Sequence, residues 1–237
     1  MIGQISLFPY DFEPRDYLFC HGTSLPVDDH FDLFRLLGNT YGGDDNTFAL
    51  PNLKAAAPPD LDYFISLSGD FPTDNVSYNA LLGETMLAPP KLAARNMMPA
   101  NGQSLLQSQY QVLNAYMGTR FGGDAQHFSL PDLRSRAAHG VQYLIAVQGE
   151  LPERFISRQP FLGEILLLPY QRPTETLWLC DGRRVSIPQN TALFTLLGIR
   201  FGGDGKNIFE LPNLTSAAPT GYSYYIVGRD GVYPPRA

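Results

Sequence analysis

The chain repeats itself at an offset of about 80 residues, and this repeat limits the folds that it can adopt. The phrase "TYGGDDNTFALPNL" at 40–53 returns as "RFGGDAQHFSLPDL" at 120–133 and as "RFGGDGKNIFELPNL" at 200–214. A fixed period indicates tandem structural units. Each unit is about 73 residues long, whereas one coil of a solenoid has ~20–45 residues. We therefore predict three small units in tandem.

The ends of the units follow from a second pair of recurring phrases. Each unit opens on a glycine after an apolar residue and closes on Gly-x-hydrophobic-Pro, as in "GDFP", "GELP" and "GVYP". The predicted units are therefore 1–72, 80–152 and 160–237, with 73–79 and 153–159 as linkers. Because units this small have limited cores, we expect the three copies to support one another.

Within each unit the pattern predicts several short strands and one short helix, an α+β fold. Apolar stretches that end at a glycine or proline predict the strands. Leucines and aromatic residues at helical spacing, followed by a glycine, predict the helix. The predicted strands lie at 3–10, 17–22, 62–69, 142–149, 163–170, 177–182 and 224–228. The predicted helices lie at 26–38, 108–118 and 188–198.

Composition excludes several classes of protein. Of the 237 residues 44% are hydrophobic and 17% charged, which argues against disorder. A net charge of -6 does not favour binding to nucleic acid or to an anionic membrane. No apolar run approaches the ~20 residues that a membrane span needs, and the N-terminus lacks the basic start of a secretory signal.

The triplicated glycine pair and aspartate have a chemical and a structural interpretation. A phosphate-binding loop would need a following Lys-Ser/Thr and a helix, and neither is present. A calcium loop would need several alternating oxygen ligands, and each copy repeats one acid. Paired glycines and an aspartate that bonds nearby amides suit a tight turn. We therefore predict structural turns rather than ligand sites at Gly42, Gly43, Asp44, Gly122, Gly123, Asp124, Gly202, Gly203 and Asp204.

The remaining reactive side chains form no recognisable constellation. The four histidines do not recur between units, and no H-x-H, H-E-x-x-H or C-x-x-C spacing occurs, so we predict no metal and no cofactor. No Gly-x-Ser-x-Gly elbow marks a nucleophile. Cys20 and Cys180 occupy one repeat position, where the middle unit has Ala100. This predicts buried thiols, with a disulfide or a reactive thiol as alternatives.

Together these phrases resemble the phage tail collar domain. The order "IGxI", "FCxG", "LF-x-LLG", "YGGD" and "LP-x-L", followed by a strand and "G-x-Φ-P-x-R", carries the resemblance. Bacterial members of that family are often labelled microcystin-dependent proteins. The third unit is the most similar, and the second departs most, with Ala100 and Asn114 in place of Cys and Phe. The resemblance covers nearly the whole chain in three copies.

The resemblance implies a tail-fibre-like structural or adhesive protein without catalytic activity, located in a virion or tail-like particle. It implies synthesis in the bacterial cytoplasm, and other tail or appendage proteins and a cell-surface glycan as candidate partners. Self-association is also open, because exposed strand edges can pair. Collar domains in tail fibres form trimers, so we expect the three fused copies to take a pseudo-threefold arrangement. The alternative function is a carbohydrate-processing or lytic tail-associated enzyme.

Overall fold

The computed structural model describes residues 1–73, 75–151 and 159–236. The described chain is mostly short strands, with three α-helices of seven residues each. The predicted linker at 153–159 lies almost wholly outside the described residues. We refer to residues 1–72, 80–152 and 160–237 as units 1, 2 and 3.

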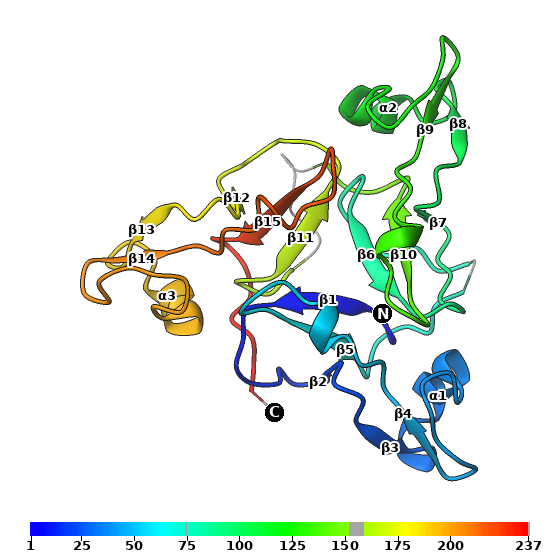
Figure 1. Ribbon diagram of the computed structural model, residues 1–237, viewed down its shortest axis with the longest axis horizontal. Helices are drawn as coiled ribbons and strands as arrows, with labels where there is room; N and C mark the ends of the chain where they lie inside the picture. The colour runs from blue at the N-terminus through cyan, green and yellow to red at the C-terminus, as the bar shows by residue number, and fades with distance from the viewer. Residues whose placement is uncertain (74, 152–158, 237) are drawn as a thin grey trace.

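The strands near the middle of the molecule form one curled antiparallel sheet, nine-stranded within the described residues (Figure 1). In unit 1 the leading strand pairs with β5, and β5 pairs with β2; units 2 and 3 repeat this order. The sheet strands are β1 (Ile5–Phe8), β2 (Tyr17–Phe19), β5 (Asp62–Ser66), β6 (Thr85–Ala88), β7 (Met97–Pro99), β10 (Gln142–Ala146), β11 (Ile165–Leu168), β12 (Leu177–Leu179) and β15 (Ser223–Val227).

The three leading strands β1, β6 and β11 also pair with one another, so the units share one sheet. Ile5 pairs with Leu87. Thr85 pairs with Leu167, and Ile165 pairs with Leu7. In every case the fifth position of one unit lies opposite the seventh position of the following unit. All of these strands carry mainly buried residues, because each is covered on both faces.

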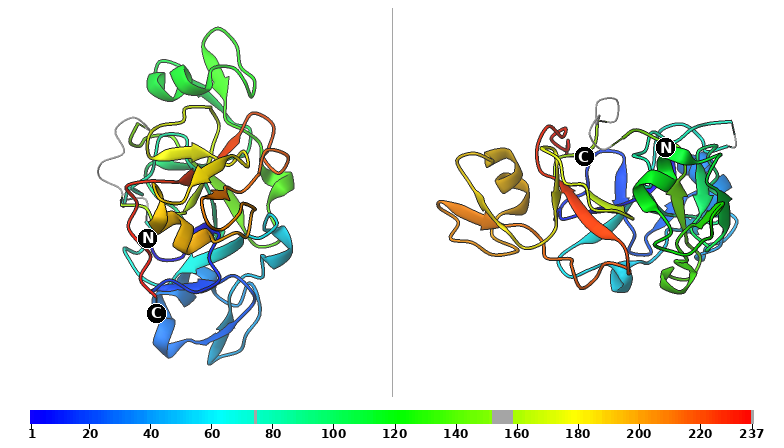
Figure 2. Two further views of the ribbon diagram at one scale, coloured as in Figure 1. Left: turned by 90° about the vertical axis from the view of Figure 1, so that its left-hand side faces the viewer. Right: turned by 90° about the horizontal axis from the view of Figure 1, so that it is seen from above.

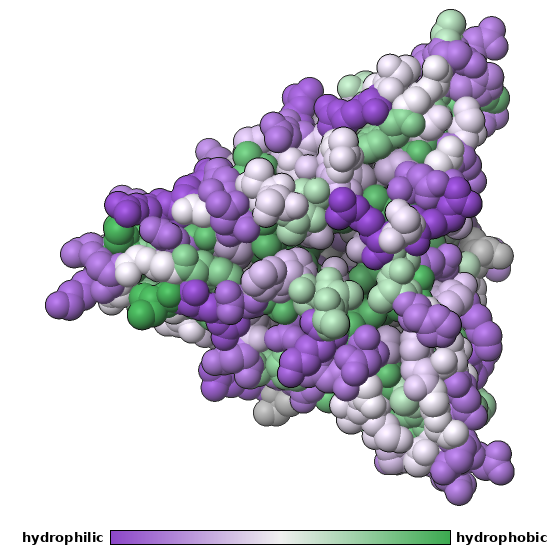
Figure 3. Space-filling view, in the orientation of Figure 1, coloured by the Kyte–Doolittle hydropathy of each residue, from purple (hydrophilic) through white to green (hydrophobic). Residues whose placement is uncertain are grey.

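From each unit an arm projects away from the sheet, and the three arms give the molecule a triangular outline (Figures 1 and 3). An arm consists of a two-stranded hairpin and one α-helix. The hairpins pair β3 (Ser24–Pro26) with β4 (Thr47–Ala49), β8 (Ser104–Leu106) with β9 (His127–Ser129), and β13 (Arg184–Ser186) with β14 (Ile208–Glu210). The helices are α1 (Phe31–Leu37), α2 (Gln111–Met117) and α3 (Thr191–Leu197). Short 3-10 turns lie at Asp28–His30, Lys54–Ala56 and Arg134–Arg136.

The predicted sheet strands are present, and a helix lies within each predicted helical range, but each helix is shorter than predicted. The first predicted range, 26–38, begins with the end of β3 and a 3-10 turn before α1. The arm hairpins were missed. Each helix ends at a glycine whose N–H bonds the helix, as Gly38 donates to the carbonyl of Phe34 at 2.6 Å. One phenylalanine forms the centre of each arm and is fully buried, at Phe48, Phe128 and Phe209. In units 1 and 3 a helix phenylalanine packs on that ring, with centroids 5.5 and 5.6 Å apart.

Unit 2 breaks this packing scheme at one position. Asn114 stands where the other arms have Phe34 and Phe194. Its Oδ1 is buried and has no hydrogen-bond partner among the described residues. A buried amide oxygen without a partner is unfavourable, so the second arm has the weaker core.

Each arm also contacts the base of the next unit along the ring. The Tyr41 hydroxyl of unit 1 donates to the carbonyl of Gly140 in unit 2. Arg120 of unit 2 donates from Nη1 to Pro169 of unit 3 at 2.7 Å. Arg200 of unit 3 donates from Nη1 to Pro9 of unit 1, also at 2.7 Å. The contacts therefore run from unit 1 to 2, from 2 to 3, and from 3 back to 1.

The C-terminal segment returns to unit 1 and lies beside it (Figure 2). The Arg15 N–H donates to the carbonyl of Pro235 at 2.8 Å, and Pro14 forms a bridge with Arg236. The Arg236 guanidinium lies 4.5 Å from the centre of the Phe12 ring. Among the described residues, none of the helices is long and apolar enough to cross a bilayer.

Candidate functional site

The triplicated glycine pairs lie in the exposed turn of each arm, between the helix and the returning strand. Gly43 has a φ of 132°, a conformation that residues with a side chain rarely adopt. A Cβ atom at Gly43 would lie 2.3 Å from the carbonyl oxygen of Thr47 and 2.7 Å from the Cα atom of Phe48. The glycine thus lets the turn lie directly against the backbone of the buried arm phenylalanine.

The aspartate after each glycine pair bonds to backbone amides of its own turn. Asp44 accepts N–H bonds from Asn46 and Thr47 at 2.9 and 2.8 Å. Asp204 accepts three such bonds, from Lys206, Asn207 and Ile208, at 2.7–2.9 Å. These backbone hydrogen bonds hold the pKa of both carboxyls below the usual range, because they favour the charged form.

Asp124 has the same geometry in the second arm. It accepts N–H bonds from Gln126 and His127, both at 2.8 Å, and these bonds lower its pKa. The turn aspartates belong to different arms, and the arms point to different corners of the molecule (Figure 1). The nine residues of the three turns therefore form three separate turns and are not brought together in one site.

The Leu-Pro-x-Leu phrase and the cysteines join each arm to the sheet. The Leu53 N–H donates to the carbonyl of Cys20 at 2.7 Å, and Leu214 repeats this bond to Cys180 at 2.8 Å. Both thiols are buried and free, which confirms the prediction of buried cysteines. Burial raises the pKa of both thiols, so neither is a reactive thiolate at neutral pH.

Two of the four histidines each bond an aspartate of their own unit. His21 bonds Asp62 at 2.8 Å in unit 1, and His127 bonds Asp124 at 3.1 Å in the second arm. Among the described residues, no three His, Cys, Asp or Glu side chains are grouped so that they could hold a metal ion.

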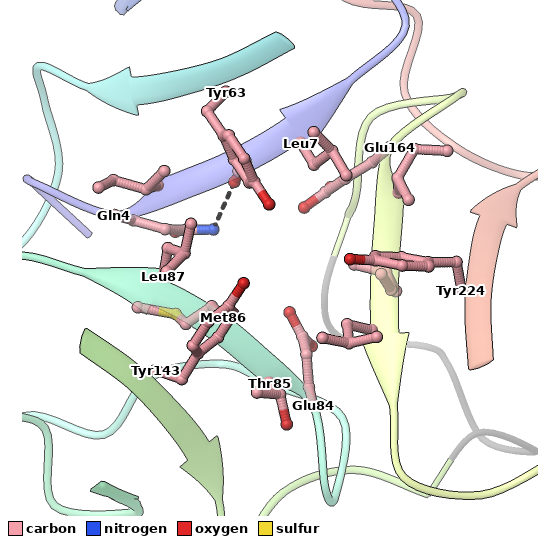
Figure 4. A pocket seen from close by; sticks show the side chains of 15 residues that line it. Gln4, Leu7, Tyr63, Glu84, Thr85, Met86, Leu87, Tyr143, Glu164 and Tyr224 are labelled. Carbon is pink, nitrogen blue, oxygen red and sulfur yellow. Dashed lines mark hydrogen bonds between the residues drawn. The ribbon is translucent and has the colours of Figure 1, made fainter. Parts of the chain in front are cut away.

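Sequence reasoning missed a small chamber at the centre of the sheet, with both polar and apolar side chains in its wall (Figure 4). The same five positions of each unit form its wall, namely the residue before the leading strand, the first three residues of that strand and one tyrosine. The lining residues are Gln4, Ile5, Ser6, Leu7 and Tyr63; Glu84, Thr85, Met86, Leu87 and Tyr143; and Glu164, Ile165, Leu166, Leu167 and Tyr224. The volume inside is about 40 Å³, which is room for one or two water molecules.

Two carboxyl groups lie in this chamber wall. Glu84 is 3% exposed and Glu164 is 5% exposed. One oxygen of each accepts a backbone N–H from its own turn, from Leu81 at 3.0 Å and from Phe161 at 3.3 Å. At the equivalent position of unit 1 the amide of Gln4 donates to Ser6 at 2.9 Å. The sequence feature that could have indicated the chamber is the polar residue directly after the opening glycine of each unit.

Three tyrosine hydroxyls enter the chamber from the facing strands (Figure 4). Burial raises the pKa of Tyr63 well above its usual value, and the neighbouring Tyr143 and Tyr224 raise it further. Burial also raises the pKa of Tyr143 and of Tyr224. All three phenols therefore stay protonated at neutral pH, and each is a hydrogen-bond donor as well as an acceptor.

Comparison with known proteins identifies the repeated unit. The family model described as Phage Tail Collar Domain matches residues 3–58, 83–138 and 163–219. Searches of curated proteins and of solved structures found no match. The three matches cover more than half of the chain and coincide with the repeated arms and leading strands. The chain therefore belongs to the phage tail collar domain family, with three tandem copies.

Proposed function

We propose that the protein is a non-enzymatic structural and adhesive component of a phage tail, or of a tail-derived particle or appendage. The observation that carries the proposal is the presence of three collar domains in one chain, since this family points to a tail structural protein. We expect the protein to contact other tail or appendage proteins through the sheet side and a cell-surface glycan through the arms.

We further propose that the three units are related by a pseudo-threefold axis through the chamber. Three observations support this. The leading strands pair in a cycle, with the same register at each step. The arm-to-base contacts form a second cycle in the same direction. Five equivalent positions from each unit line the chamber. One chain would then supply the three collar units that three identical chains supply in a homotrimer.

The arms offer three different polar surfaces for adhesion. The arm tips are mostly hydrophilic in the view of Figure 3. Asp28, Asp29 and Asp32 give the first arm an acidic helix start, whereas Arg183 and Arg184 give the third arm basic side chains. Because the shared residues of the arms serve the fold, the residues that differ between arms are the candidates for contact with a receptor.

Glycoside hydrolases also use a pair of carboxyl groups, so Glu84 and Glu164 bear on the alternative function as an enzyme. A glycosidase places its two carboxyl groups on either side of a bound glycosidic bond. The chamber that holds Glu84 and Glu164 has a volume of about 40 Å³, which leaves no room for a sugar ring. The paired glutamates of this chamber are therefore not placed to act on a glycosidic bond.

A glycan array followed by a turnover assay on every bound glycan tests the proposal. We expect retention of a subset of glycans and no released product. A variant with Asp28 and Asp29 changed to Asn should alter the glycans bound, and Glu175→Gln, an exposed residue of the sheet side, is the matched control. Release of product at a rate that the Glu84→Gln variant abolishes would establish the enzyme instead.

A further inference from the structure

We propose that the central chamber is a binding site for one partly dehydrated monovalent cation, of the size of sodium, potassium or ammonium. The chamber lies where the three leading strands meet, and its wall presents oxygen atoms from all three units (Figure 4). These oxygens belong to carboxyl, phenol, amide and hydroxyl groups, which are the ligands that hard cations prefer.

The hydroxyl group of Tyr224 indicates that the chamber takes an occupant. Tyr224 is 9% exposed, and its side chain points into the chamber. Among the hydrogen bonds of the described residues none involves this hydroxyl, which borders the open space of the chamber. Buried polar groups in native proteins almost always have a partner. A bound species in the chamber would supply that partner.

The charge of the wall selects a cation over an anion or a neutral molecule. Glu84 and Glu164 both face the chamber, and the residues that line it include no Lys, Arg or His. The lining thus holds two acidic groups, while Arg136 acts on Tyr143 and Tyr224 from outside it. A phenol can donate its proton to a carboxylate oxygen and turn a lone pair toward a cation. Tyr63 and Tyr143 are hydrogen-bonded to each other, and the hydroxyl of Tyr224 points into the same space (Figure 4).

Size and ligand number select a monovalent ion. The volume of about 40 Å³ holds one ion with at most one water molecule. Magnesium keeps several water molecules in protein sites and would not fit. Calcium sites take 6–8 oxygens at close range, commonly from several carboxylates, and this wall supplies two carboxylates. A larger organic cation, such as N-methylglucamine, is excluded by volume.

Thermal unfolding in matched salts tests the site. We expect the melting temperature of the full chain to be about 3–6 °C higher in a chloride salt of the bound cation than in N-methylglucamine chloride. This shift corresponds to a cation at about ten times its dissociation constant. Equal ionic strength keeps screening constant, and parallel samples in sodium, potassium and ammonium chloride identify the ion.

Two variants locate the effect. Glu164→Gln removes a chamber carboxylate and should abolish most of the shift, whereas Glu175→Gln, an exposed glutamate, should keep it. Equal melting temperatures in all salts would overturn the proposal and leave a chamber that holds only water. Loss of the shift in both variants, or a shift with calcium or magnesium alone, would also overturn it.

A direct measurement covers the case in which Glu164→Gln does not fold. Crystals of the native chain soaked in rubidium chloride should show an anomalous scattering peak between the hydroxyls of Tyr63, Tyr143 and Tyr224. Absence of that peak at a saturating concentration would refute the cation site.

Discussion

Replacement of Gly43 by alanine should destabilise the protein far more than the same replacement at Gly118. Both glycines have a positive φ angle, 132° at Gly43 and 57° at Gly118. Either alanine therefore incurs backbone strain of about 1–3 kcal/mol. Only Gly43 adds a clash, because its Cβ atom would lie 2.3 Å from the Thr47 carbonyl oxygen. A Cβ atom at Gly118 would meet nothing within 4 Å.

The energetic cost of this clash depends on which atoms would have to move. The two nearest atoms are backbone atoms of Thr47 and of Phe48, whose side chain is fully buried, so they cannot move as a flexible side chain would. Overpacking of this kind costs about 1–3 kcal/mol. We therefore expect Gly43→Ala to lower the free energy of unfolding by about 2–6 kcal/mol, and Gly118→Ala by about 1–3 kcal/mol.

Urea unfolding, followed by circular dichroism and tyrosine fluorescence, measures both variants. The effect of alanine on the unfolded chain is the same at the two sites, so it cancels in the comparison. Equal losses in the two variants would refute the idea that the glycine pair exists to let the turn approach the strand. A Gly43→Ala protein that melts like the wild type but loses glycan binding would instead make the turn a ligand site.

Four further outcomes test other parts of the structure. Tyr170→Phe removes the buried hydrogen bond to the Leu82 carbonyl and should lower the free energy of unfolding in urea by about 1–3 kcal/mol. Tyr233→Phe is the control, because it removes only an exposed hydrogen bond to Thr195; equal losses in the two variants would contradict a stabilising role of the buried bond. Asn114→Phe should raise the melting temperature, because it replaces a buried amide oxygen without a partner by the ring that the other arms use; a lower value would show that the second arm lacks room. The pKa of Asp204 is lower in the folded protein than in the unfolded chain, so its charged carboxylate stabilises the fold. This stabilisation is present above the ordinary pKa of about 4 and is lost as the pH falls through the pKa of the folded protein. An NMR titration of the carboxyl carbon that gives Asp204 an ordinary pKa would contradict this. Small-angle scattering should give a radius of gyration near ~18 Å, and a value above about 24 Å would favour a string of separate units.

The sequence predicted those parts of the fold that local pattern determines. Each helix has apolar residues at helical spacing and a glycine at its end, and the structure has all three. The leading and closing strands are apolar runs between turn residues, which is a strong local signal. The cysteine positions were readable because Ala100 stands in the same place, and only a small buried site accepts both residues.

Neither the arm hairpins nor the central chamber could be predicted from the sequence, and each for a physical reason. The arm strands have three residues each, which is too short for an alternating pattern to stand out. The chamber depends on three segments about 80 residues apart in the chain. Gln4, Glu84 and Glu164 each look like one polar residue at the start of an apolar strand, and only pairing between units brings them together.

The contacts between units differ from one junction to the next. Residues 73–79 join units 1 and 2, and at this junction Thr40 and Pro90 replace the arginine and tyrosine of the other two. No linker joins unit 3 to unit 1. That junction has both Arg200 and Tyr10, whose hydroxyl donates to the Leu162 carbonyl at 2.5 Å.

The C-terminal segment adds a third contact at the same junction, through the Arg15 bond to Pro235. A covalent linker raises the effective concentration of its two ends, so weak contacts suffice where one exists. Where none exists, the non-covalent contacts alone must offset the loss of chain entropy on closing the ring. The linked junction between units 2 and 3 keeps both contacts, from Arg120 to Pro169 and from Tyr170 to Leu82. What distinguishes the open junction is therefore the C-terminal segment, which lies across unit 1 and adds a contact where no linker holds the two units together.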